Sequence, residues 1–200
     1  MAVWLNPIEL EGNLVKLVPL QKDHKVDLVF AASDGKLWEL WYTTVPTSTT
    51  MDAYLNKALL EQETGQSLPF TIIDKRTDKV VGTTRYLNVD AKHKRVEIGA
   101  TWYAQKTQRT GINTECKYLL LQHAFETLDC IAVEFRTNFH NHPSRNAILR
   151  LGAKQDGILR NHRIDDHGNL RDTVVFSILN SEWPTVKMAL DFKRKRGGSR

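Results

Sequence analysis

Residues 96–126 read VEIGATWYAQKTQRTGINTECKYLLLQHAFE, and this stretch decides the fold. Its first part is rich in β-formers and predicts a strand over 95–103. A short polar turn containing Gly111 leads directly into a helix predicted over 114–128, which is apolar on most sides. Such a turn leaves backbone N–H groups unpaired at the helix start, where the helix dipole adds positive potential. The stretch therefore predicts a phosphate site, with charge from Lys106 and Arg109 and close backbone approach at Gly111.

Two common phosphate-binding motifs are absent from the chain. A nucleoside triphosphate loop needs GxxxxGK[ST], and a dinucleotide fold needs GxGxxG after its first strand. A pyrophosphate that is not hydrolysed therefore remains the candidate ligand. Within the strand 95–103, alternation predicts that Val96, Ile98, Ala100 and Trp102 share one face and that Glu97 lies on the other.

The segments around this stretch predict a mixed, mostly antiparallel sheet of about seven strands in an α/β (α+β) domain. Hairpins and helical crossovers both occur, with no repeat and no linker, which favours one domain over 1–192. Residues 193–200 form a basic tail that we expect to be disordered. The expected strands are 13–20, 70–74, 80–89, 95–103, 131–138, 157–164 and 170–179, and the expected helices are 23–32, 49–64, 114–128, 143–151 and 182–192.

Composition sets broad limits on the function. The 200 residues are 41% hydrophobic and 26% charged, an ordinary globular balance, and the net charge is +5. No segment resembles an export signal or a membrane span, so we expect a cytoplasmic protein. Cys116 and Cys130 are expected to be buried free thiols.

The turn resembles that of a known family. Gln108, Gly111 and Asn113 occupy the positions of the Q/R-x-x-G-x-G/A motif of GNAT acetyltransferases, although Asn113 departs from Gly or Ala. The text QRTGINTECKYLLLQHAFE is similar to the RimJ/RimL subgroup of N-terminal acetyltransferases. The resemblance spans about residues 10–190 and implies acetyl-CoA as donor. It also implies the cofactor contacts Trp102, Tyr103, Gln108, Arg109, Thr110, Gly111, Ile112, Asn113, Thr114, Asn141 and Ser144.

A second match lies in NHPSRNAILRLGA, residues 141–153. Asn141, Ser144 and Gly152 resemble the helix that lies beside the pantetheine arm in this family. The family often has a Tyr seven residues after the Asn as the acid for the leaving thiolate, but Ile148 stands here. The resemblance to RimL-like members points to Ser144 as the acid instead, and its competing role is a hydrogen bond at the helix start.

Glu97 is the leading candidate for the general base, acting through water. A salt bridge to Arg95 or Arg136 is an equally weighted role for this carboxylate. Glu134 is a weaker substitute as base. The resemblance also suggests that Trp38, Trp41 and Tyr42 line the acceptor site, although aromatic residues in such a connection are more often core residues.

The expected activity is therefore direct transfer of an acetyl group to a primary amine, on a small molecule or on a protein N-terminus. The histidines have no metal-ligand spacing, so no metal is expected. One alternative is a non-catalytic acyl-CoA-binding sensor or scaffold, supported by the loss of the Tyr at Ile148. A second alternative, a nucleic-acid-binding module, rests only on the basic charge, and nucleic acid is not the expected partner. The resemblance makes a homodimer reasonable.

Overall fold

The strands predicted between 70 and 103 form the centre of one eight-stranded sheet, in a computed structural model that describes residues 4–165 and 168–197. The strand order is β1-β2-β3-β4-β5-β6-β8-β7, and only the β5–β6 pair is parallel. This confirms the predicted mixed, mostly antiparallel sheet, with the short β1 as an eighth strand. The strands are β1 (Leu10–Glu11), β2 (Val15–Pro19), β3 (Leu68–Asp74), β4 (Lys79–Asp90), β5 (Arg95–Tyr103), β6 (Ala132–Asn138), β7 (Lys154–Ile164) and β8 (Leu170–Leu179).

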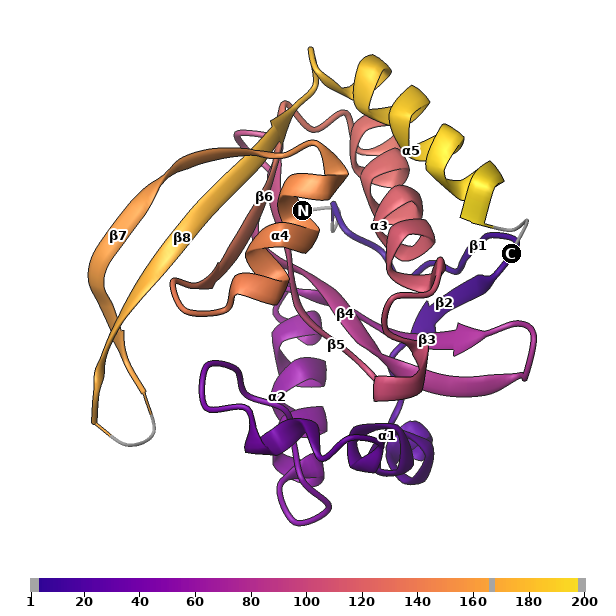
Figure 1. Cartoon of the computed structure of the whole chain (residues 1–200), viewed down its shortest axis with the longest axis vertical. Helices are drawn as coiled ribbons and strands as arrows, with labels where there is room; N and C mark the ends of the chain where they lie inside the picture. Colours follow the sequence, from indigo (N-terminus) through magenta and orange to yellow (C-terminus); the bar gives the residue numbers. More distant parts are fainter. Residues whose placement is uncertain (1–3, 166–167, 198–200) are drawn as a thin grey trace.

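Helices cover both faces of the sheet (Figure 1). On one face, α3, α4 and α5 enclose a large core that includes Phe70, Tyr86 and Phe176. On the other face, α1 and α2 enclose a smaller core around Leu28, Met51 and Leu55. The helices are α1 (Lys25–Ser33), α2 (Met51–Glu63), α3 (Ile112–Gln122), α4 (His142–Leu151) and α5 (Trp183–Gly197).

A β-bulge in β5 changes which residues share a face. Thr83 and Arg85 of β4 lie opposite Trp102 and Gly99, so β5 has one extra residue between these pairs. Ala100 lies within the bulge and has a φ of 46°. Because one inserted residue reverses the alternation, Trp102 belongs to the α1–α2 core and not to the face of Val96 and Ile98. The predicted alternation is therefore correct up to Ile98 and wrong beyond it.

The C-terminal helix is longer than predicted. We expected it to end near residue 192 and a disordered tail to follow, but α5 continues to Gly197. Arg194 lies on this added turn and forms an ion pair with Glu115 of α3. The buried Glu115 thus stabilises a turn of α5 that the basic composition had suggested to be solvated and disordered. Residues 198–200 lie outside the described residues. Cys116 and Cys130 are free and buried, as expected.

Candidate functional site

The parallel pair β5–β6 is hydrogen-bonded only at its beginning. Arg95, Val96 and Glu97 pair with Ala132, Val133 and Glu134, and the two strands then continue to Tyr103 and Asn138 without pairing further with each other. The bulge at Ala100 lies in this unpaired part of β5. Two diverging parallel strands leave backbone N–H and C=O groups without ladder partners, and such groups can bind an extended ligand between them.

The turn from β5 into α3 has five backbone N–H groups that donate to none of the residues the structure describes. Nearby, Gln108 N donates to Gln105 O at 3.0 Å and Glu115 N to Gly111 O at 3.0 Å, so the turn itself is well defined. Arg109 has a φ of 61°, a left-handed conformation found in anion-binding nests. The free groups belong to Arg109, Thr110, Gly111, Asn113 and Thr114.

Gly111 packs closely against the end of the Leu14 side chain. Gly111 has an ordinary φ of −68°, but a Cβ there would lie 2.8 Å from Leu14 Cδ1. The side chain of Gln108 donates to Tyr103 O at 3.2 Å, and the Arg109 side chain is exposed. The turn therefore presents main-chain donors and the exposed Arg109 side chain to a ligand.

Several predicted cofactor contacts have buried side chains. Trp102 lies in the α1–α2 core, and Ile112 and Tyr103 pack in or against the other core. Neither Trp102 Nε1 nor the Tyr103 hydroxyl has a hydrogen-bond partner within the described part of the chain. A ligand at the diverging strands or at the turn would therefore contact these three residues through their backbone groups. Asn113 and Thr114 are half-buried in the first turn of α3.

Glu97 lies on the sheet face opposite Val96 and Ile98, as predicted, and its side chain is 7% exposed. Burial raises the pKa of its carboxyl, while a hydrogen bond from Asn88 and the nearby Arg136 oppose the shift. Asn88 Nδ2 donates to Glu97 Oε2 at 2.6 Å, and Arg136 Nε lies 3.5 Å from the same oxygen. Of the two salt-bridge partners weighed for Glu97, Arg136 is the one that lies near it, and the carboxyl keeps a raised pKa beside this arginine.

A second β-bulge directs Asn88 toward Glu97. Leu87 lies opposite Glu97 and Asp90 opposite Arg95, which leaves an extra residue in β4, and Asn88 has a φ of 46°. Sequence analysis missed Asn88, because no pattern in the sequence locates this bulge. Beside Glu97 is a cleft of about 180 Å³ lined by Asn88, Asp90, Arg95, Val96, Glu97, Glu134 and Arg136.

The carboxylate on the next strand is more fully paired. Glu134 forms ion pairs with Arg95 and with Arg136 Nη2, the latter at 2.9 Å. Burial raises the pKa of Glu134, but these arginines outweigh burial and the net shift is downward. Glu97 therefore suits a proton acceptor near neutral pH better than Glu134.

The hydrogen bond at the start of α4 involves the backbone N–H of Ser144 and not its side chain, which is the group that the sequence had suggested. Asn141 is the N-cap, and its Oδ1 accepts a hydrogen bond from Ser144 N at 3.0 Å. The Ser144 hydroxyl donates to no described group, so it is available to a ligand. Ile148, at the position of the family's Tyr, is buried in the large core. Gly152 ends the helix with a φ of 105°.

The three aromatic residues predicted to line the acceptor site lie in different environments. Trp38 packs against the α1–α2 core, which is the structural role weighed for it. Trp41 is 63% exposed and its ring centroid lies 5.7 Å from that of Tyr42 and 5.4 Å from that of His140. The loop before α2 thus contacts the segment before α4. His140 was not among the predicted site residues, and only tertiary contacts reveal it.

Lys117 on α3 was also missed. It is fully enclosed between α3 and the sheet, and burial lowers its pKa to about 8. Its Nζ donates to Thr101 Oγ1 at 2.6 Å and to Thr84 Oγ1 at 3.2 Å. A lysine between Cys116 and the run Tyr118–Leu121 is the signal that the sequence contained.

No helix in residues 4–165 and 168–197 is long and apolar enough to cross a bilayer. Within those residues, no three His, Cys, Asp or Glu side chains form a group that would hold a metal ion.

Comparison with known proteins identifies the arrangement. A family model described as an acetyltransferase (GNAT) domain matches residues 15–154. An N-acetyltransferase p20 of Bacillus licheniformis, described as uncharacterized, is 30% identical over 142 residues, which cover 71% of this chain and 77% of that protein. The crystal structure of a GCN5-related N-acetyltransferase from Brucella melitensis has a TM-score of 0.85 at 32% identity and covers 94% of this chain and 85% of that one.

A more distant structure bears on the subgroup. Mycobacterium smegmatis RimJ in complex with CoA-disulfide has a TM-score of 0.75 at 22% identity and covers 94% of this chain and 93% of that one. At this identity the likeness extends to the fold. RimJ-like proteins are therefore structural neighbours of the chain, and its membership of the RimJ/RimL subgroup is not established by them.

Proposed function

The chain belongs to the GNAT acetyltransferase family, and on that premise we propose that it moves the acetyl group of acetyl-CoA directly to a primary amine. The acceptor is the α-amine of a peptide or the amine of a small molecule. We also propose that the chain belongs to the RimJ/RimL subgroup, acts in the cytoplasm and forms a homodimer; the resemblance noted in the sequence supports these three points.

One observation carries the proposal: five N–H groups that have no partner in the described part of the chain surround the start of α3, after the diverging β5. Donors of this kind at a helix N-terminus suit the pyrophosphate of acetyl-CoA. The unpaired edges of β5 and β6 suit its extended pantetheine arm. Arg109 adds charge at the turn, and Asn141 and Ser144 lie at the end of β6 where the arm would reach α4.

The chemistry then needs a base, an oxyanion donor and an acid. Glu97, through water, accepts the proton of the ammonium so that the neutral amine attacks the thioester carbonyl carbon. Backbone N–H groups of the unpaired part of β5 stabilise the oxyanion. The C–S bond breaks as the attacking nitrogen loses its extra proton, and the Ser144 hydroxyl gives a proton to the leaving thiolate and takes up the one released by the nitrogen.

The decisive test removes one free N–H from the turn. Asn113 is in the first turn of α3, where proline is tolerated, and its N–H makes no bond that the helix would lose. We expect Asn113→Pro to weaken acetyl-CoA binding about tenfold or more, since hydrogen bonds to charged groups contribute about 1.5–3 kcal/mol. Asn113→Ala keeps the N–H and is the matched control. Equal affinities of the two variants, measured by calorimetry, contradict the assignment.

A thiol-release assay with a panel of amines tests turnover. Release of CoA with an amine and not without one supports the enzyme. Tight acetyl-CoA binding without release for any amine would instead favour the non-catalytic sensor, the function suggested by Ile148.

A further inference from the structure

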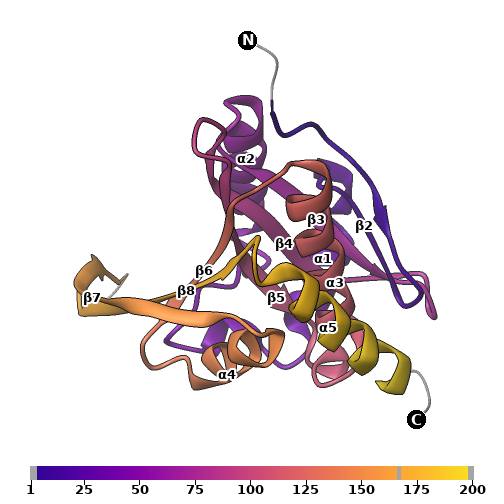
Figure 2. The ribbon, with the colours of Figure 1, turned by 90° about the horizontal axis from the view of Figure 1, so that it is seen from above.

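The β7–β8 hairpin extends past the end of β6. β8 pairs with β6 as far as Thr173, opposite Asn138, whereas β7 and β8 remain paired to Ile164 and Leu170. Figures 1 and 2 show this part of the hairpin projecting from the body of the sheet.

Two arginines face each other across this projecting part. Arg163 of β7 is directly opposite Arg171 of β8, and like charges in this position are destabilising. Within residues 4–165 and 168–197, neither guanidinium takes part in an ion pair. Arg171 is half-buried, and its Nε is fully buried without a hydrogen-bond partner in the described residues. A buried donor of this kind indicates an absent acceptor.

The arginine pair lies on the same sheet face as Glu97. β8 pairs with β6 without irregularity, so Arg171 shares its face with Thr173 and Ser177. Ser177 is opposite Glu134, which is opposite Glu97. Arg163 is close enough to contribute to the electrostatics of the Glu97 carboxyl, whose pKa burial raises and this arginine lowers.

Arg136 and His162 continue this basic surface between the hairpin and Glu97. Arg136 is opposite Val175 on the same face, and its Nε lies 3.5 Å from Glu97 Oε2. His162 Nδ1 is 3.1 Å from Thr173 Oγ1, and burial and the charges of Arg163, Arg136 and Arg171 lower its pKa.

We propose that Arg163 and Arg171 bind an anionic group of the acceptor, so that the enzyme acts on amines that also carry a carboxylate or a phosphate. The inference rests on the proposed function. The cleft beside Glu97 is lined by three carboxylates and by two arginines that pair with Glu134, and the less fully paired Glu97 suits the amine end. The two guanidinium groups can bind the oxygens of a carboxylate or a phosphate at the other end of the acceptor. An anion there offsets the repulsion between Arg163 and Arg171 and gives Arg171 Nε an acceptor.

The hairpin contains its own control residue. Arg160, also on β7, forms an ion pair with Asp172 Oδ2 at 2.6 Å. Asp172 neighbours Arg171 in β8 and therefore points to the opposite face. Arg160→Gln removes the same charge from the same hairpin without changing the proposed anion site.

The test compares matched amines. Amines with a terminal carboxylate, from β-alanine to 6-aminohexanoate, are each paired with the corresponding carboxamide, and 2-aminoethyl phosphate is paired with 2-aminoethanol. We expect kcat/KM in the thiol-release assay to favour at least one anionic member by tenfold or more. The carboxylate and phosphate arms identify which anion is used.

Variants then identify the residues that cause the preference for anionic amines. We expect Arg171→Gln and Arg163→Gln to raise KM for the anionic amine at least tenfold, with KM for its neutral partner and for acetyl-CoA unchanged. Arg160→Gln should behave as wild type. Arg163 is exposed, so its variant serves if Arg171→Gln fails to fold.

The outcomes separate the two proposals. Equal kcat/KM for charged and neutral partners, or equal losses in Arg160→Gln, overturns the anion site and leaves the acetyltransferase function standing. Absence of thiol release with every amine overturns the proposed function. In that case calorimetric binding of the anionic amines to wild type and not to Arg171→Gln supports the anion site, and no such difference overturns it.

Discussion

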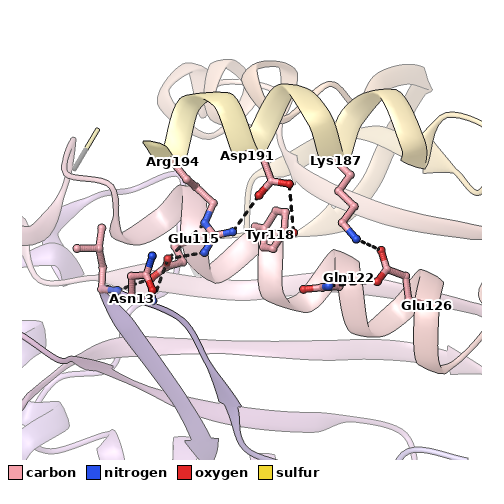
Figure 3. Close-up of polar contacts among 9 residues, drawn as sticks. Asn13, Glu115, Tyr118, Gln122, Glu126, Lys187, Asp191 and Arg194 are labelled. Atoms are coloured by element: carbon pink, nitrogen blue, oxygen red, sulfur yellow. Dashed lines mark hydrogen bonds and ion pairs between the residues drawn. The ribbon is translucent and has the colours of Figure 1, made fainter. Parts of the chain in front are cut away.

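The carboxylate of Glu115 on α3 accepts from Arg194 Nη2 on α5 at 2.7 Å (Figure 3). Glu115 is 2% exposed and also accepts the backbone N–H groups of Asn13, Leu14 and Val15, at 3.1, 2.6 and 3.0 Å. One side chain therefore joins α3 to the β1–β2 hairpin and to the C-terminal part of α5. Leu14, whose N–H it binds, packs at Gly111.

Removing this carboxylate should strongly destabilise the fold. We expect Glu115→Ala to lower the free energy of unfolding by about 3–5 kcal/mol, because Arg194 and three backbone donors lose their acceptor. Lys187→Ala is the control, because its ion pair with Glu126 at 2.7 Å is partly exposed and contributes about 0–1 kcal/mol. Urea denaturation measures both, and similar losses for the two variants would contradict the role of Glu115.

The same carboxylate predicts an acid sensitivity. Burial raises the pKa of Glu115, but Arg194 and the backbone N–H groups outweigh burial, and the net pKa is below its ordinary value of 4.5. Its stabilisation is therefore complete above pH 4.5 and is lost as the pH falls through the folded-state pKa. The difference in unfolding free energy between wild type and Glu115→Gln should shrink over that acidic range. A difference independent of pH would contradict this sign.

The buried Lys117 predicts that the free energy of unfolding rises as the pH increases in the alkaline range. Its pKa falls from 10.5 to about 8 in the folded state, which corresponds to a penalty of about 3 kcal/mol at neutral pH. We expect Lys117→Met to stabilise the protein at pH 7, since Thr84 and Thr101 still bond each other at 2.8 Å. Wild type should regain stability as the pH rises from about 8 to 10.5, so the advantage of the variant should shrink. Thermal unfolding of both proteins across this range is the measurement.

The bulge in β5 contains a position at which we expect glycine to stabilise the fold relative to alanine. Ala100 has a φ of 46°, where a Cβ is unfavourable and glycine is not. Ala100→Gly should raise the free energy of unfolding, by about 1 kcal/mol. Ala132→Gly, in the regular β6, is the control and should lower it. A loss of stability in Ala100→Gly would show that the bulge is not strained.

The base assignment predicts a pH profile. Because burial raises the pKa of Glu97, kcat/KM should fall on the acidic side through a pKa above 4.5. Glu97→Gln should remove this limb and lower the rate about 100-fold or more. Asn88→Ala removes a hydrogen bond that lowers the pKa, so the limb should move to higher pH.

Glu134→Gln is the control for the base, since Glu134 occupies the matching position on β6. If it reproduces the loss seen in Glu97→Gln, or if Glu97→Gln keeps the wild-type profile, the assignment is wrong.

The geometry of the turn before α3 was predicted from the sequence because that geometry is local. Gln108, Gly111 and Asn113 are close together in the chain, and the strand–turn–helix geometry follows from adjacent segments. The availability of the N–H groups of this turn also follows from helix geometry. By contrast, Trp38 and Trp41 differ in burial although they are three residues apart, because packing against the α1–α2 core involves Leu28 and Met51 from other segments.

The sequence by itself determined the order and type of the main elements, the mixed sheet and the turn before α3, because hydrophobic period and turn chemistry act over a few residues. Only the tertiary structure decided that Trp102 changes face, that Asn88 and Arg136 contact Glu97, and that Arg163 faces Arg171. Two bulges and the pairing of strands distant in the chain set those relationships. The free energy that selects them comes from contacts between residues far apart in sequence, and no local pattern encodes such contacts.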